Sequence, residues 1–365
     1  MTVGSDPVPT TTTSYLHALV RSDIWFADGN VVLIAGSAAF KVHRGQLQRH
    51  SEVFRDLFEI GRPPPTKRGG MVEGCPTVDL YDCPSDVHHL LVALYDGLYF
   101  SKPHATDFSS LSSVLRLSTK YFIEHLRLQC LTRLSQDWPS TLADWDKREA
   151  AATDSSGRYA PRDALAHPIL AINLALELGL PEVLPSAFFD LSRYGPSKIL
   201  QGARAFPPPP VIHLSHDSLV RTLKGRESAQ LYISTFLRRA LAQHPSPSCL
   251  HSAKLSSSSS SATQTPTPSP HCTESFYFIQ LNVLRSVGGI ACGRDADPLY
   301  TLTQAAEMLE RKDFSDGVRT CGLRMCGVCK KEWKGEVGRA RAEVWGMIPG
   351  WFGSVDLVIA SMVPL

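Results

Sequence analysis

The segment FKVHRGQL at positions 40–47, followed by SEVFRDLF at positions 51–58, decides the fold of the first part of this 365-residue chain. The first segment begins as a short apolar strand and leaves it at a His-Arg pair. Across the two segments, Leu47, Phe54 and Leu57 recur at roughly helical spacing, so one helix face is apolar. The pattern predicts a strand that turns directly into a helix and presents a surface. It contains no signature of catalysis.

Short strands are predicted on both sides of this segment. Residues 22–26 and 31–35 are apolar runs joined by the dipeptide Asp28-Gly29. Asp-Gly between such runs is a strong hairpin signal, because Gly tolerates positive φ. Residues 77–80 alternate apolar and polar side chains, as a third strand does.

Helices are predicted after the last of these strands. Residues 84–95 place apolar side chains at i, i+3, i+4, i+7 and i+8, which fits an amphipathic helix. Residues 111–134 supply two more helical stretches, with Phe122 and Leu126 among the side chains expected to face inward. Short strands together with these helices predict an α+β fold for this part of the chain.

Together these motifs resemble a BTB/POZ domain. The segments DGNVVLIAG, FKVHRGQL and HSEVFRDLF are most similar to the BTB proteins that are abundant in mushroom-forming (basidiomycete) fungi. The resemblance implies a BTB/POZ domain over residues 14–137, with a short β-sheet flanked by helices. It also implies a protein–protein interaction module that is not an enzyme.

The resemblance implies specific partner-binding residues. In this family the first strand and helix build a dimer interface, and many members place a charged pair near it. Asp23 and Arg44 match that pair, and Leu47 is a further candidate contact. The apolar faces of Trp25, Phe26, Val31 and Leu33 fit a homodimer interface, and the same four side chains also fit core positions. The alternative is structural: Asp23 caps a strand, and Arg44 covers apolar surface with its stem.

A second partner is implied by a short motif. Many BTB proteins are substrate adaptors of cullin-type ubiquitin ligases and carry a hydrophobic-x-Glu motif before the strand that follows the helix pair. Met71-Val72-Glu73 fits this pattern, so Met71 and Glu73 are candidate cullin contacts. The Pro/Gly-rich insertion at residues 61–70 departs from the usual loop length.

The rest of the chain predicts a mostly α-helical region in two parts, residues 138–244 and 274–365. Residues 245–273 between them are of low complexity and include six consecutive serines, so we expect a disordered insert. Residues 1–13 are expected to be a disordered tail. Helices are expected over residues 167–180, 181–194, 215–223, 230–242, 276–284, 299–309 and 332–347.

The chain has nine cysteines, an odd number, and its polar N-terminus does not read as a secretory signal, which fits a reducing compartment. The sharpest pattern among them is Cys321-x₄-Cys326-x₂-Cys329. Plant-type [2Fe–2S] ferredoxins share this spacing but need a fourth cysteine downstream, and none follows here. A cluster would have to recruit Cys292 or Cys272 from upstream.

A structural zinc site fits this pattern better than a cluster. Cys326-Gly327-Val328-Cys329 resembles half of a zinc knuckle, Cys321 supplies a third thiolate, and Cys292 or a histidine supplies a fourth. A thioredoxin-like redox pair is a further alternative. A zinc assignment is strong when a sequence has two CxxC pairs, and this chain has one. The favoured interpretation is therefore free thiols that pack a turn between helices. We therefore expect no cofactor, with zinc as the alternative.

Composition narrows the remaining function classes. The net charge of +2 gives no global attraction to nucleic acid, and the longest apolar runs fall far short of the ~20 residues that span a bilayer. We expect an intracellular protein, cytoplasmic or nuclear, that binds proteins and no membrane. Two alternatives stay open: a zinc- or thiol-based protein centred on the C-terminal cysteines, and a nuclear transcriptional regulator that uses the basic residues of 311–341.

Overall fold

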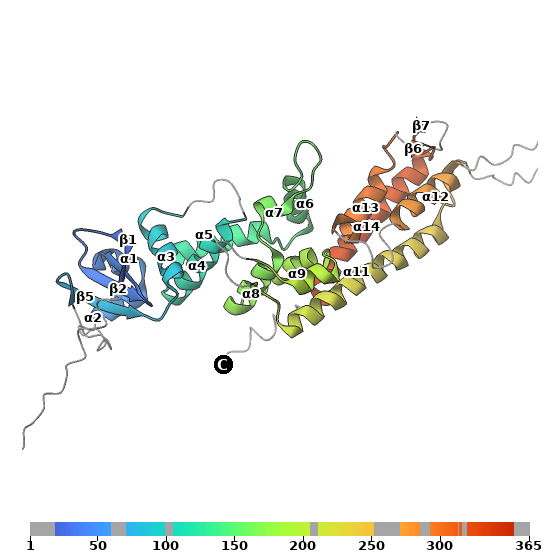
Figure 1. Cartoon of the computed structure of the whole chain (residues 1–365). Coiled ribbons are helices and arrows are strands. Elements are labelled where there is room, and N and C mark those ends of the chain that lie inside the picture. Colours follow the sequence, from blue (N-terminus) through green and yellow to red (C-terminus); the bar gives the residue numbers. More distant parts are fainter. Residues whose placement is uncertain are drawn as a thin grey trace, which may run out of the picture. The chain divides into compact units, whose positions relative to one another are not determined.

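The computed structural model describes residues 19–59, 71–98, 105–204, 211–251, 271–284, 293–312, 314–315 and 320–353. These form two compact units (Figure 1). The first contains the chain up to Asp137 together with residues 152–166, and the second contains residues 138–151 and the chain from His167 onward. The first unit combines a sheet with helices and the second is mainly helical, which confirms the predicted fold class.

Among the described residues, the sheet of the first unit has five strands: β1 (Val20–Trp25), β2 (Val31–Ala35), β3 (Ala38–Val42), β4 (Met71–Val72) and β5 (Cys75–Leu80). Their order across the sheet is β1-β3-β2-β5-β4. Strand β2 pairs antiparallel with β3 and parallel with β5. Strand β1 pairs parallel with β3 and lies at one edge, while β4 lies at the other.

The prediction of a hairpin at Asp28-Gly29 is wrong. The strands on either side of this dipeptide, β1 and β2, do not pair, because β3 lies between them. The tight turn is at Gly36, between β2 and β3, where φ is 56° and glycine is favoured. Gly29 serves a different purpose. A Cβ on Gly29 would lie 2.9 Å from Cγ of Lys41, so glycine allows the chain to pass close to β3.

The helices of the first unit pack around this sheet. Only His43 separates β3 from α1 (Arg44–His50), as the segment 40–58 predicts. Ser51 then separates α1 from a second helix, α2 (Glu52–Glu59). The Ser51 hydroxyl accepts a hydrogen bond from the Phe54 amide (3.1 Å) and donates one to the Tyr121 carbonyl oxygen (2.6 Å), which ties this helix start to a distant segment. The helices are α1 (Arg44–His50), α2 (Glu52–Glu59), α3 (Pro84–Tyr95), α4 (Asp107–Lys120), α5 (Glu124–Asp137) and α7 (Pro161–Ala164).

The connection between α4 and α5 corrects one expected core residue. Phe122 is 64% exposed and has a φ of 52°. The amide of Ile123 donates to the carbonyl oxygen of Ser118 (2.8 Å), which closes the end of α4 in the manner of a Schellman motif. The left-handed backbone at Phe122 turns its ring away from the core, which helical periodicity does not reveal.

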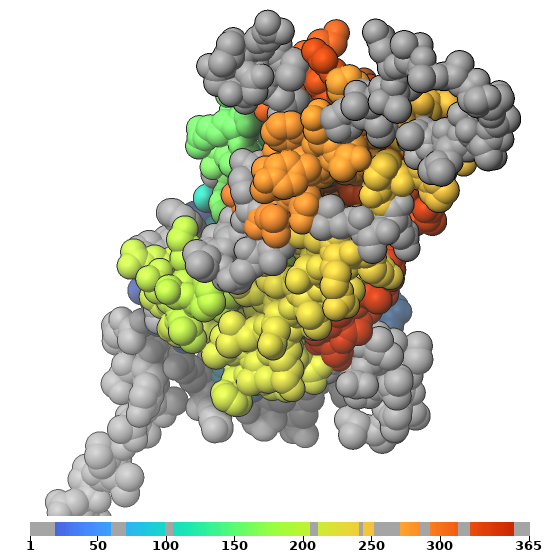
Figure 2. All heavy atoms as spheres, turned by 90° about the vertical axis from the view of Figure 1, so that its right-hand side faces the viewer, coloured from blue at the N-terminus to red at the C-terminus, as the bar shows by residue number. Residues whose placement is uncertain are grey.

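The second unit is built around two long helices. Helices α11 and α14 pack against each other, and α12 and α13 pack beside them (Figures 1 and 2). The helices of this unit are α6 (Leu142–Ala151), α8 (Pro168–Leu178), α9 (Leu184–Ser192), α10 (Pro196–Gln201), α11 (His216–Gln243), α12 (His271–Leu284), α13 (Pro298–Glu307) and α14 (Gly327–Trp351), with the short elements η2 (Gly293–Ala296), β6 (Phe314–Ser315) and β7 (Thr320–Cys321).

Helix α11 is one element where two were expected, over residues 215–223 and 230–242. Its start is as predicted, since the Ser215 hydroxyl caps it by accepting from the Ser218 amide. Gly225 does not interrupt it. A Cβ on Gly225 would lie 1.9 Å from a ring carbon of the buried Phe352, so this glycine makes room for an aromatic ring.

The edges of the expected insert also differ in the structure. Residues 245–251 form a turn that buries Cys249, and α12 begins at His271, before the expected end of the insert at residue 273. Residues 252–270, the N-terminal tail and the prolines 207–210 lie outside the described residues. In the described part of the chain, no helix is long and apolar enough to cross a bilayer.

A buried ionic network joins three segments of the second unit. Asp190 on α9 accepts hydrogen bonds from Arg148 on α6 (2.6 Å) and from Arg193. Arg193 also pairs with Glu149 (2.8 Å) and with Asp297 (3.2 Å), which caps α13. Burial raises the pKa of Asp297 to about 6, although Arg193 opposes the shift. Because a buried charge without its partner is costly, this network fixes α6, α9 and α13 against one another.

A matched pair of glycine substitutions tests the packing of α11. Gly225→Ala is expected to lower the free energy of unfolding by about 1–3 kcal/mol, because the new methyl group overlaps the Phe352 ring. Gly338→Ala on α14, where the Cβ meets open space, is expected to raise it by up to about 1 kcal/mol, since alanine is the better helix former. Chemical denaturation followed by circular dichroism measures both. Stabilisation by both variants would contradict the close packing of α11 against Phe352.

Candidate functional site

Half-buried apolar side chains lie on one face of the sheet, at edge strand β1 and at the opposite edge strand β4. Leu19, Trp25 and Val72 pack there against a buried cluster, and each of the three stays partly exposed. Apolar surface therefore remains accessible directly above the core. The cluster beneath consists of Val32, Ile34, Ala39 and Cys75.

Charged side chains border this surface. The guanidinium carbon of Arg21 lies 4.6 Å from the centre of the Trp25 ring. Arg21 also pairs with Glu73, whose other carboxylate oxygen lies 3.6 Å from Nζ of Lys41. The structure thus brings together two predicted site residues, Trp25 and Glu73, through Arg21, which the sequence did not single out. We call Leu19, Arg21, Trp25, Val72 and Glu73 the edge patch.

The Met71-Val72-Glu73 motif precedes β5, as expected, but it is a strand and a tight turn rather than a loop. Met71 is 66% exposed in β4. Glu73 has a φ of 47°, which places it in the left-handed region at the turn into β5. Its carboxylate is held by Arg21 and Lys41, so the motif presents an exposed thioether beside a paired carboxylate.

Asp23 and Arg44, expected as a charged pair, each have another partner within the chain. Oδ1 of Asp23 lies 2.9 Å from Nε2 of His88 on α3, and hydrogen bonding from Ser22 holds the pKa of this exposed carboxyl below its usual value. Nη2 of Arg44 donates to the Phe58 carbonyl oxygen (2.5 Å), and its guanidinium carbon lies 5.0 Å from the centre of the Phe58 ring. Arg44 therefore links the start of α1 to α2.

Leu47 is a correction to the expected contact set. It is 1% exposed and belongs to the core of the first unit. A side chain buried within one chain cannot touch a partner directly, so Leu47 acts on any interface only by supporting the fold.

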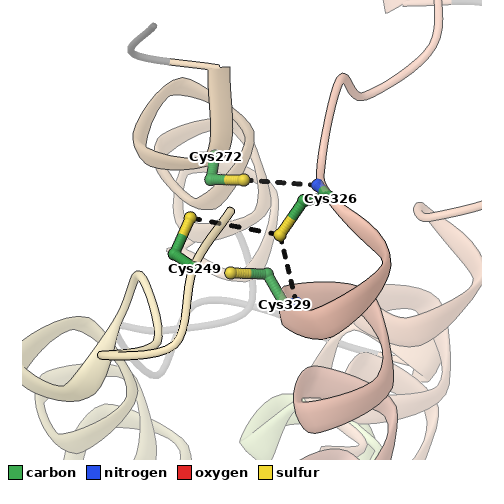
Figure 3. Close-up of side chains that lie close together, drawn as sticks. All are labelled: Cys249, Cys272, Cys326 and Cys329. Carbon is green, nitrogen blue, oxygen red and sulfur yellow. Dashed lines mark hydrogen bonds between the residues drawn. The ribbon is translucent and has the colours of Figure 1, made fainter. Parts of the chain in front are cut away.

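Four cysteines meet in the second unit (Figure 3). Cys249 lies in the turn after α11, Cys272 in the first turn of α12, and Cys326 and Cys329 at the start of α14. All four are buried, and their Sγ atoms lie within 4.8 Å of one another. Sγ of Cys249 is 4.0 Å from Sγ of Cys326, far longer than a disulfide bond of about 2.05 Å. This group of four thiols could hold a metal ion.

Backbone amides and a histidine point at these sulfur atoms. The Cys326 amide donates to Sγ of Cys272 (3.3 Å), and the Cys329 amide donates to Sγ of Cys326 (3.5 Å). Nδ1 of His251 lies 3.2 Å from Sγ of Cys272. Burial opposes ionisation of Cys326, yet hydrogen bonds from the amides of Cys329 and Leu250 lower the pKa of this thiol to about 6. Burial raises the pKa of Cys272 to about 11.

The cysteine group partly matches the expected one. Cys326 and Cys329 come together as the CxxC spacing predicts. The expected third ligand, Cys321, lies in β7, and its side chain and all of Cys292 fall outside the described residues. Cys272, one of the two upstream cysteines considered for a cluster, belongs to the group, and Cys249 completes it. Sequence reasoning missed Cys249 because it was assigned, with Cys272, to the low-complexity insert, and the spacing of these two matches no metal-binding motif.

One comparison with known proteins gives a match. Residues 26–137 match the family model of the BTB/POZ domain. The matched range begins immediately after β1 and includes every element from β2 to α5. No curated protein and no solved structure matches the chain. BTB/POZ domains generally mediate protein–protein interaction and are generally not enzymes.

Proposed function

Residues 26–137 form a BTB/POZ domain, and from this premise we propose that the chain is a non-catalytic scaffold or adaptor that pairs with a second copy of itself. The two copies meet along β1 and the edge patch. The helical second unit either recognises a further protein or braces the domain. The likeness to BTB proteins of mushroom-forming fungi rests on sequence motifs alone, and a cytoplasmic or nuclear location remains a prediction.

The observation that carries this proposal is the open edge at β1. Strand β1 pairs with β3 on one side, and no described strand pairs with its other side. An edge strand leaves backbone donors and acceptors available to a partner chain. Beside it, the edge patch combines an aromatic ring, an arginine and exposed apolar surface, which are enriched at protein interfaces.

Charge placed on β1 tests the pairing. Val20 is 65% exposed at the start of this strand, so Val20→Asp leaves the core intact but opposes docking of a second edge. We expect the full wild-type chain to sediment as a dimer at micromolar concentration, and Val20→Asp to weaken the dimer at least about tenfold, which is about 1.4 kcal/mol. Analytical ultracentrifugation over a concentration series measures this.

Leu128→Asp is the matched control, because Leu128 is also exposed (52%) but lies on α5, away from the sheet. It should dimerise like the wild-type chain. A wild-type chain that stays monomeric throughout the series, or equal weakening by both variants, would refute pairing along β1.

We also propose that the adaptor role includes a cullin-type ubiquitin ligase, on the basis of the exposed Met71 beside Glu73. Met71→Asp should abolish binding of the full chain to a purified cullin N-terminal domain in calorimetry, because it replaces an exposed apolar anchor with a charge. Dimerisation should persist in this variant. Absence of binding by the wild-type chain would exclude the cullin and leave the dimer proposal standing.

The nuclear-regulator alternative is less well supported. Two basic side chains of α14 have acidic partners in the second unit: Lys334 pairs with Glu310 (2.8 Å) and Arg341 with Asp146 (2.5 Å). A surface built to bind nucleic acid leaves such cations available for phosphate groups. The pairing favours a structural role for this helix, and we do not propose nucleic-acid binding.

A further inference from the structure

We propose that Cys249, Cys272, Cys326 and Cys329 bind one structural Zn²⁺ ion as four thiolates (Figure 3). This inference does not depend on the proposed function of the BTB/POZ domain, since all four residues lie in the second unit. The ion would join the turn after α11, the first turn of α12 and the start of α14.

The spacing of the sulfur atoms fits a single tetrahedral ion. Four ligands about 2.3 Å from a zinc ion are about 3.8 Å from one another. The four Sγ atoms lie within 4.8 Å of one another, and the pair Cys249–Cys326 is 4.0 Å apart. Small side-chain rotations are therefore enough to close the site around the ion.

The ligand set favours a structural zinc over other metals. Four sulfur ligands in a tetrahedral arrangement suit zinc or iron, whereas oxygen-binding cations such as Mg²⁺ and Ca²⁺ are excluded. All four side chains are buried, with 0–7% exposure, so no coordination position opens to a substrate. A closed four-cysteine site is the arrangement of structural rather than catalytic zinc.

The surroundings of the cluster suit thiolates. Amide groups of Cys326 and Cys329 donate to neighbouring sulfur atoms, and Nδ1 of His251 lies 3.2 Å from Sγ of Cys272. Such outer hydrogen bonds orient metal ligands and offset their negative charge. Cys326 also caps α14, where the helix dipole favours a negative charge. Zinc binding would release the remaining thiol protons to solvent.

The position of the site along the chain suggests that the ion holds separate helices together, which we call its bracing role. Cys249 precedes the low-complexity residues 252–270 and Cys272 follows them. The ion would therefore fix both flanks of this segment to the start of α14. Helices α11 and α12 would then stay packed against α14 independently of the conformation of residues 252–270. Helix α12 has 14 residues, a length at which an isolated helix is marginal, so an ion that fixes its first turn would stabilise it.

Metal analysis of the full chain, purified under reducing conditions from zinc-containing medium, tests the proposal. We expect about one zinc per chain and little iron. The double variant Cys249→Ser/Cys272→Ser should lose the metal. The control Cys83→Ser/Cys130→Ser, which changes one exposed and one buried cysteine of the first unit, should keep it.

A second measurement avoids any folding defect in the variants. Replacing zinc by Co²⁺ in the wild-type chain should give the visible ligand-field bands and intense sulfur-to-cobalt charge transfer of a tetrahedral tetrathiolate site. A wild-type chain without zinc that also fails to give this spectrum would overturn the proposal. So would iron as the resident metal, an intramolecular disulfide in its place, or full zinc retention by Cys249→Ser/Cys272→Ser.

Hydrogen exchange tests the bracing role. Removal of the metal with a chelator should speed amide exchange in α12 and at the start of α14, and leave β2 in the first unit unchanged. Unchanged exchange in α12 after complete metal removal would overturn the bracing role. The dimer of the full chain should survive chelation, so failure of the zinc proposal and failure of the pairing proposal are separable.

Discussion

Burial of both faces of β2 is the constraint on which the first unit depends. All five of its residues are buried, so it must lie inside the sheet with cover above and below. Strands β3 and β5 take the places beside it, which moves β1 to one edge and β4 to the other. The surface that is left open, the β1 edge with the edge patch, is a consequence of this arrangement. The proposed interface therefore lies at β1 because the burial of β2 leaves β1 at the edge of the sheet.

The second unit depends on polar and sulfur chemistry as well as apolar packing. Arg148 on α6, Asp190 and Arg193 at α9, and Asp297 at the start of α13 form a buried ionic network. Because removing one partner leaves a buried charge unpaired, the network fixes these three segments against one another. At the C-terminal end of α11, four buried cysteines bring the turn after α11, the first turn of α12 and the start of α14 together. Low-complexity residues separate α11 from α12 in the sequence. A zinc ion bound by these cysteines would hold the ends of both helices against α14.

The sequence predicted the elements better than their arrangement. Helical periodicity reports which face is buried, so α3, α8 and the start of α11 were found close to their true positions. Strand pairing depends on contacts between segments that are distant in sequence. The local Asp28-Gly29 signal therefore does not reveal that β3 lies between β1 and β2. The sequence pattern predicts two helices, over residues 215–223 and 230–242, where the structure has one. Gly225 fits inside this helix because it packs against Phe352, which is distant in sequence. The meeting of Cys249 with Cys326 was missed for the same reason: only folding brings them together.

The most direct test of the central claim is amide hydrogen exchange of Val20–Trp25 in the full chain, measured at protein concentrations below and above the dimer dissociation constant. Pairing along β1 predicts that exchange in this strand slows at the higher concentration, while exchange on the exposed surface of α5 stays the same. Identical exchange in β1 at both concentrations, in a chain that sedimentation shows to be dimeric at the higher one, would contradict the account.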